Sequence, residues 1–148
     1  MEKHVNGFVF VSNELKKFKR PILDVPNIVI GNGLKIRKKQ ENTVVNNSVV
    51  FIGSKEHYWN GFELIEDLSQ KNLDIMFHII GIEGQSKSNL QFHGKLEEEK
   101  AQKIISNAVA AISTLALFRK GMIEASPLKS RLYMSLEIPF IYSLMVIK

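Results

Sequence analysis

The sequence contains no cysteine among its 148 residues. A disulfide framework, a thiolate metal site and a cysteine nucleophile are therefore excluded. Long apolar runs are also missing, since the two longest, residues 108–118 and 138–147, fall well short of the roughly 20 residues that cross a bilayer. The first residues are polar and lead into a strand-like run, so we expect no secretory leader. These absences favour a protein of the reducing cytoplasm.

The remaining composition is that of a globular protein with a single core. Hydrophobic residues make up 45% of the chain and charged residues 24%, which separates it from disordered and fibrous proteins. At roughly 150 residues per domain, the length predicts one domain. The net charge of +5 lies in residues 1–48, which hold nine Lys or Arg and four Asp or Glu, whereas the rest of the chain holds eleven of each.

The excess positive charge is concentrated in two clusters, residues 16–20 and 35–39. The simplest interpretation is a solvated basic surface, and the alternatives are a phosphorylated ligand or the anionic face of a membrane. Nucleic acid is not expected as a partner, because neither a recognition motif nor a basic strand with interleaved aromatic residues accompanies the charge.

Strand-like apolar runs alternate with helix-like segments along the chain. Strands are predicted at residues 7–11, 27–30, 49–53, 76–81, 90–94, 109–113 and 138–142. Helices are predicted from Ser12, at residues 60–71 and 97–108, and along the stripe Ala125, Leu128, Leu132 and Leu136. Strands separated by helices are typical of a parallel sheet. The predicted fold class is therefore α/β, a Rossmann-like parallel sheet with helices on both faces.

Small residues follow several of the predicted strands. These strand ends read Gly53-Ser54, Gly81-Ile82-Glu83-Gly84, Gly94-Lys95 and Ser113-Thr114. Ligands of open α/β sheets bind beyond the carboxyl ends of the strands, and glycine lets the backbone approach a ligand closely. The pattern favours a ligand cleft, and the alternative is that each glycine only forms a turn.

The strongest local signal for ligand binding is the segment from Glu124 to Arg131. Ser126 is a good N-cap and Pro127 a good first helical residue. Lys129 then falls in the first turn, where a cation opposes the helix dipole. A bound phosphate reverses that sign, because free N–H groups and nearby cations both face it. The segment therefore predicts an anion site, most plausibly for a diphosphate, unless both cations simply point to solvent.

Other chemistries find no support in the sequence. A phosphate-binding P-loop, a Gly-x-Gly-x-x-Gly turn and a Gly-x-Ser-x-Gly elbow are all missing. The four histidines are scattered, and His78 and His93 fall inside predicted strands, where core or rim positions are more common than metal ligation. We therefore expect no metal site and no bound cofactor.

The order of these motifs resembles the C-terminal, nucleotide-sugar-binding domain of GT-B glycosyltransferases of the family 4 type. The residues that carry the resemblance are 9–12 with 30–33, 50–53 with 59–61, 78–81 with 90–94, and Glu124 with Ser126-Pro127-Leu128-Lys129-Ser130-Arg131-Leu132-Tyr133 and 138–140. The sequence departs from the family pattern at Ser54 (usually Arg), Asn60 (usually Lys), Leu132 (usually Glu) and Glu137 (usually Gly).

The resemblance implies the donor-binding half of a retaining, metal-independent enzyme that moves a sugar from a nucleotide-diphosphate donor to a saccharide or lipid-linked acceptor. Residues 1–148 would form the donor domain, and the N-terminal acceptor domain would lie outside this chain. In such a domain Glu124 would hold donor sugar hydroxyls, and Lys129 would neutralise the leaving diphosphate. The implied donor-binding residues are Gly53, Ser54, Asn60, Gly61, Gly81, Glu83, Lys95, Leu96, Ser126, Pro127, Leu128 and Arg131.

The resemblance also implies partners and a location. They are a nucleotide sugar, the missing N-terminal domain, and a peripheral contact at the inner face of a membrane. These 148 residues are expected to be inactive alone, because catalysis needs an acceptor oriented against the donor. The alternative function is a truncated or degenerate module that binds a nucleotide without catalysis or serves as an interaction surface, and the substitutions at Ser54, Asn60 and Leu132 favour it.

Overall fold

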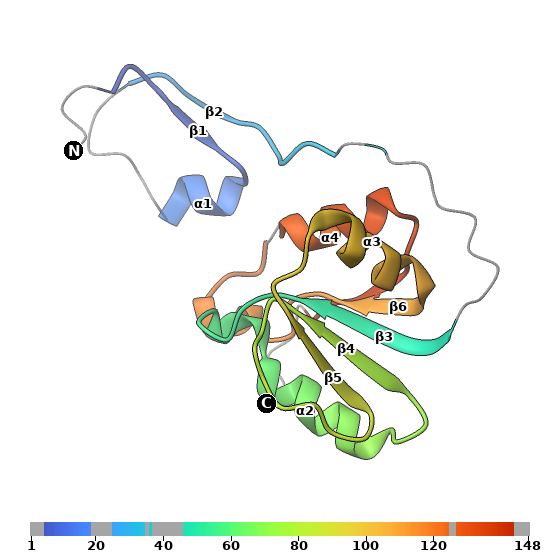
Figure 1. The fold of residues 1–148 in the computed structure, drawn as a ribbon. Helices are drawn as coiled ribbons and strands as arrows, with labels where there is room; N and C mark the ends of the chain where they lie inside the picture. Colours follow the sequence, from blue (N-terminus) through green and yellow to red (C-terminus); the bar gives the residue numbers. More distant parts are fainter. Residues whose placement is uncertain (1–4, 19–24, 35, 37–45, 125–126, 144–148) are drawn as a thin grey trace.

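The structure is a computed structural model, and it describes residues 5–18, 25–34, 36, 46–124 and 127–143. Within these ranges the strands form two separate parallel sheets. The larger sheet has five strands in the order β5-β4-β3-β6-β7, and the smaller pairs β1 with β2 (Figure 1). The single sheet predicted from the sequence is therefore wrong for β1 and β2, because an apolar run does not show which strand it pairs with.

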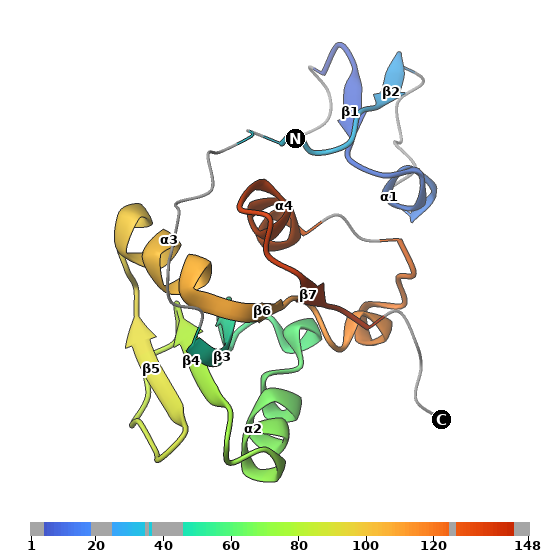
Figure 2. The ribbon, with the colours of Figure 1, turned by 90° about the vertical axis from the view of Figure 1, so that its right-hand side faces the viewer.

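The larger sheet confirms the predicted α/β class. Its strands are β3 (Asn46–Ile52), β4 (Met76–Ile80), β5 (Leu90–Gly94), β6 (Ala108–Ile112) and β7 (Phe140–Ile141). Successive side chains of β3 point to opposite faces. Val49 and Phe51 enter one core cluster, and Val50 enters the other. Both faces are covered by helices, as parallel sheets require: α2 lies on one face and α3 and α4 lie on the other (Figure 2).

Two of the covering helices follow their predicted patterns. The helix α2 (Phe62–Lys71) buries Phe62 and Ile65, and the 3-10 turn η1 (Tyr58–Asn60) precedes it. The helix α3 (Glu98–Asn107) carries two glutamates in its first turn, which suits the positive end of the helix dipole. Among the described residues, no helix is long and apolar enough to cross a membrane.

The helix α4 (Leu128–Ser135) departs from its prediction. Its N-cap position is Pro127, whose ψ of 138° is extended, so Pro127 is not the first helical residue, and Ser126 lies outside the described residues. The predicted leucine stripe is confirmed only in part: Leu136 is buried and Leu132 packs against the same core cluster, but Leu128 is 72% exposed. Tyr133, which the stripe did not include, is fully buried. The Tyr133 hydroxyl donates to the Ile112 carbonyl at 3.1 Å and accepts from the Ile52 amide at 3.2 Å. A side chain that joins two strand ends therefore fixes α4 to the sheet.

The smaller sheet belongs to a β1–α1–β2 unit, made of β1 (Phe8–Phe10), α1 (Asn13–Phe18) and β2 (Asn27–Val29). Ser12 caps α1 as predicted, since its hydroxyl accepts from the Leu15 amide at 3.1 Å. The unit lies beside the loop that leads into α4 (Figures 1 and 2). It therefore forms a second wall opposite the carboxyl end of the larger sheet.

Candidate functional site

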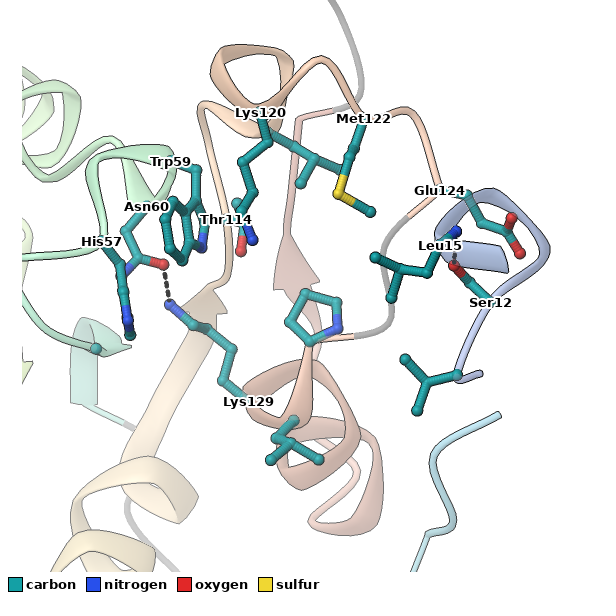
Figure 3. Close-up of a pocket in the computed structure, with 15 residues that line it drawn as sticks. Ser12, Leu15, His57, Trp59, Asn60, Thr114, Lys120, Met122, Glu124 and Lys129 are labelled. Atoms are coloured by element: carbon teal, nitrogen blue, oxygen red, sulfur yellow. Dashed lines mark hydrogen bonds between the residues drawn. The ribbon is translucent and has the colours of Figure 1, made fainter. Parts of the chain in front are cut away.

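A cavity of about 380 Å³ opens between the two walls (Figure 3). The β1–α1–β2 unit contributes Val11, Ser12 and Leu15; the larger sheet and its loops contribute Gly53, His57, Trp59, Asn60, Thr114, Leu117, Lys120, Met122 and Glu124; and the start of α4 contributes Pro127, Leu128 and Lys129. Six of these residues, Gly53, Asn60, Glu124, Pro127, Leu128 and Lys129, are predicted donor-binding or catalytic positions. The cavity therefore brings together predicted site residues that are far apart in the sequence, those at 53–60 and those at 124–129.

Lys129 reaches into this cavity from the first turn of α4. Its Nζ donates to Asn60 Oδ1 at 2.8 Å and lies 4.2 Å from the centre of the Phe51 ring. Burial lowers the pKa of Lys129 to about 7, because the ammonium has lost much of its hydration. None of the ion pairs found among the described residues includes Lys129. The cavity thus holds a lysine whose protonated form a bound anion would stabilise.

Asn60 links Lys129 to the end of β3. Its side-chain Nδ2 donates to the Ser54 carbonyl at 3.1 Å, so its Oδ1 is oriented toward Lys129. The Ser54 hydroxyl is buried and has no hydrogen-bond partner among the described residues. Asn60, held by the Ser54 carbonyl, therefore orients the lysine from α4.

Three of the predicted glycines serve close packing. At Gly81, where φ is +88°, a Cβ would lie 2.5 Å from the Gly53 carbonyl oxygen. The Gly53 amide donates to the Ile80 carbonyl at 3.0 Å. Gly61 has a φ of +69°, and a Cβ there would lie 3.2 Å from the Cβ atoms of Leu115 and Ala116. These glycines let the ends of neighbouring strands and turns touch, and Gly53 itself lines the cavity.

Glu124 lies at the α1 side of the cavity, away from Lys129 and Asn60 (Figure 3). Its carboxylate accepts from the Glu14 amide at 2.9 Å. In return, the Glu14 carboxylate accepts from the Glu124 amide at 2.6 Å and from the Ile123 amide at 3.0 Å. We call this reciprocal arrangement the Glu14–Glu124 clasp. It connects the β1–α1–β2 unit to the loop before α4.

Among the described residues, the other predicted donor-binding positions do not line the cavity. Leu96 packs against the core cluster beneath α3 and α4, Lys95 is exposed, and Glu83 lies against Gly94. Arg131 extends toward the segment after β2, where a Cβ on Gly31 would lie 3.9 Å from its Nη2. The structure therefore places these residues around the cavity and not in its lining.

Sequence reasoning did not single out Trp59, His57 and Lys120 as site residues. The Lys120 Nζ lies 3.8 Å from the centre of the Trp59 ring, and the His57 ring stacks on Trp59 with centroids 4.6 Å apart. They meet because η1 contacts the loop before η2 (Leu117–Lys120): the Ala116 amide donates to the Trp59 carbonyl at 3.1 Å. The one feature of the sequence that could have pointed to them is the position of the single tryptophan, next to the predicted site residue Asn60.

A second cluster of titratable groups lies on β4 and β5, outside the cavity lining. His78 Nδ1 and His93 Nε2 are 3.0 Å apart. Burial lowers the pKa of both histidines. Among the described residues, no group of three or more His, Asp or Glu gathers in a way that could hold a metal ion.

Comparison with known proteins supports the fold. A variant of S. aureus TarM in complex with Fondaparinux, α-GlcNAc-glycerol and UDP matches with a TM-score of 0.68 at 16% identity, over 95% of this chain and 30% of TarM. The pneumococcal O-GlcNAc transferase GtfA in complex with UDP and GlcNAc matches with a TM-score of 0.65 at 14% identity, over 93% of this chain and 30% of GtfA. No protein-family model and no curated protein matches the sequence.

These structural neighbours are GT-B-type glycosyltransferases. The chain spans about 30% of their length. At this level of identity the likeness concerns the fold, and it confirms a Rossmann-like α/β sheet of the kind found in half of a GT-B enzyme.

Proposed function

We propose that this chain is the donor-binding part of a glycosyltransferase and that its cavity takes a nucleotide-diphosphate sugar. The observation that carries the proposal is the position of Lys129 inside the cavity, on Asn60 Oδ1 and over the Phe51 ring. A buried lysine is costly unless a partner restores its charge. A diphosphate is an anion that fits a cavity of this size, and it is part of the nucleotide-sugar donors that glycosyltransferases use.

The start of α4 supplies the second element of such a site. The first intrahelical bond of α4 runs from the Arg131 amide to the Pro127 carbonyl at 3.3 Å. The amides of Leu128, Lys129 and Ser130 therefore have no acceptor within the helix. Amides at a helix N-terminus favour a phosphate, and the Lys129 ammonium lies on the same turn. Together they would stabilise the charge that develops on a leaving diphosphate.

Glu124 would contact the sugar of the donor. Its Oε2 accepts from the Glu14 amide, and each carboxylate oxygen can accept more than one hydrogen bond. The carboxylate can therefore accept from a sugar hydroxyl while it holds the clasp. In this proposal the whole enzyme would be a retaining transferase whose acceptor is held by a domain outside this chain, which agrees with the 30% of its neighbours that it spans.

The neighbours supply the probe, because both carry UDP in their complexes. We expect UDP-GlcNAc to bind this chain without added metal. Lys129→Met should weaken that binding by about 10- to 100-fold, the equivalent of about 1.5–3 kcal/mol for a charge-assisted hydrogen bond. Isothermal titration calorimetry of the wild-type chain and Lys129→Met measures this difference.

Lys103→Met is the matched control, because Lys103 is exposed on α3 and does not line the cavity. It removes the same charge and should bind as the wild type does. Equal affinity of the wild type and Lys129→Met would contradict the proposed site. If the wild type does not bind UDP-GlcNAc, UDP or other nucleotide sugars at millimolar concentration, the degenerate, non-catalytic module becomes the better description.

A further inference from the structure

Lys120 is a second cation that enters the cavity, from η2 and on the opposite side from Lys129. Its Nζ lies 3.8 Å above the centre of the Trp59 ring, while the Lys129 Nζ is held on Asn60 Oδ1. Figure 3 shows both side chains extending toward the space beside Trp59 and Asn60. Two ammonium groups from different elements therefore converge on one part of the cavity.

The two lysines differ in how they are held. Lys129 is half-buried and held by a hydrogen bond to Asn60. Lys120 is exposed, and the Trp59 face is its one contact among those found in the described residues. A cation over an aromatic face at an exposed site is held weakly. An anion in the cavity can therefore draw Lys120 away from the ring at little cost.

We propose that Lys120 is the second diphosphate cation of this site and that it leaves the face of Trp59 when the donor binds. This inference rests on the proposed function. The diphosphate of a nucleotide sugar carries two negative charges, one on each phosphate. Lys129 and Lys120 would supply two positive charges. Lys129 is held in position before the donor binds, and Lys120 would move to the donor from the face of Trp59.

This assignment explains how the site can work with Ser54 and Asn60 in it. Neither residue carries a charge, and Asn60 is committed to Lys129 and to the Ser54 carbonyl. Among the lining residues, the acidic group is that of Glu124. It lies at the α1 side of the cavity, where its carboxylate accepts from the Glu14 amide. The part of the cavity nearest Trp59 is therefore positive, and an anion is expected there.

Trp59 makes the movement of Lys120 visible, because it is the only tryptophan of the chain. Its emission reports on the charge above its ring. If Lys120 moves to a phosphate, the emission of Trp59 should change when UDP-GlcNAc is added. In Lys120→Met no ammonium lies over the ring, so the same addition should produce a much smaller change.

The experiment measures both affinity and Trp59 emission for UDP-GlcNAc with the wild type, Lys120→Met, Lys120→Arg and the control Lys103→Met. We expect Lys120→Met to bind about tenfold more weakly, as expected for the loss of one charge-assisted contact. Lys120→Arg keeps the charge and should stay within about threefold of the wild type, and Lys103→Met should be unchanged. Because Lys120 is exposed, these variants are expected to fold normally.

The outcomes separate this inference from the function on which it rests. If Lys120→Met binds as tightly as the wild type, and its Trp59 emission changes as much on addition of UDP-GlcNAc, the role of Lys120 is overturned. The proposed function then remains intact. Equal weakening in Lys120→Met and Lys103→Met also overturns it, because the effect then comes from net charge alone. Failure of the wild type to bind removes the proposed function and the role of Lys120 together.

Discussion

The two sheets of this molecule are built from similar apolar strands but are buried very differently. In the five-stranded sheet, Phe51 and Ile79 are fully buried. In the two-stranded sheet, Val9 is 67% exposed and Ile28 55% exposed. Parallel strands are normally covered on both faces, and a sheet of two strands is marginal alone. The comparison teaches that the larger sheet fixes the cavity, while the β1–α1–β2 unit is held in place mainly by contacts such as the Glu14–Glu124 clasp.

The largest effect is expected from truncating a buried isoleucine of the larger sheet. Ile79→Ala should lower the free energy of unfolding by about 2–5 kcal/mol, because it removes buried apolar atoms and leaves a cavity. Ile28→Ala is the matched change in β2 and should cost less than about 0.5 kcal/mol, since Ile28 is largely exposed. Urea unfolding of both variants tests the contrast, and similar losses would show that the two sheets contribute equally.

A smaller effect is expected at the hydroxyl of Tyr133. Tyr133→Phe keeps the ring and removes the oxygen that joins the Ile52 amide to the Ile112 carbonyl. The loss should cost about 1–3 kcal/mol, because a buried carbonyl and a part-buried amide are left without this partner. The same unfolding measurement decides it, and a variant as stable as the wild type would show that packing alone fixes α4.

A smaller effect on global stability than at Tyr133 is expected at the clasp. Glu14→Gln weakens the acceptor for the Ile123 and Glu124 amides, which are exposed, so we expect a loss below about 1 kcal/mol. Hydrogen exchange should nevertheless become faster in β1, α1 and β2, because local opening is cheaper than global unfolding. Unchanged exchange in this unit, or equal acceleration in β3 and β4, would contradict the comparison.

Much of the larger sheet could be predicted from the sequence, because local patterns define it. Continuous apolar runs mark β3 and β4, and the bounds of β5 agree with the predicted residues 90–94. Two features could not be predicted, because they depend on contacts distant in sequence. The separation of β1 and β2 into their own sheet is one. The burial of Tyr133 beside Leu136 is the other, since its hydroxyl bonds to backbone groups of β3 and β6.

The candidate site divides in the same way. Asn60, Glu124 and Lys129 were accessible to sequence reasoning, because each belongs to a strand-end or helix-start motif. Trp59 and Lys120 lie on short 3-10 turns that meet through backbone hydrogen bonds between residues about 57 positions apart, such as the Ala116 amide and the Trp59 carbonyl. No local pattern signals that meeting.

The proton uptake that accompanies donor binding tests the central claim, that Lys129 is the diphosphate cation, most directly. With a pKa of about 7 in the ligand-free protein, Lys129 is mostly neutral at pH 8, and a bound diphosphate raises its pKa. UDP-GlcNAc itself does not titrate near this pH. Calorimetry in two buffers of different ionisation enthalpy should therefore show uptake of about one proton per bound donor at pH 8, with affinity falling as the pH rises above 7. Lys129→Arg, which stays charged, should show almost none. Binding by the wild-type chain without proton uptake would contradict the account.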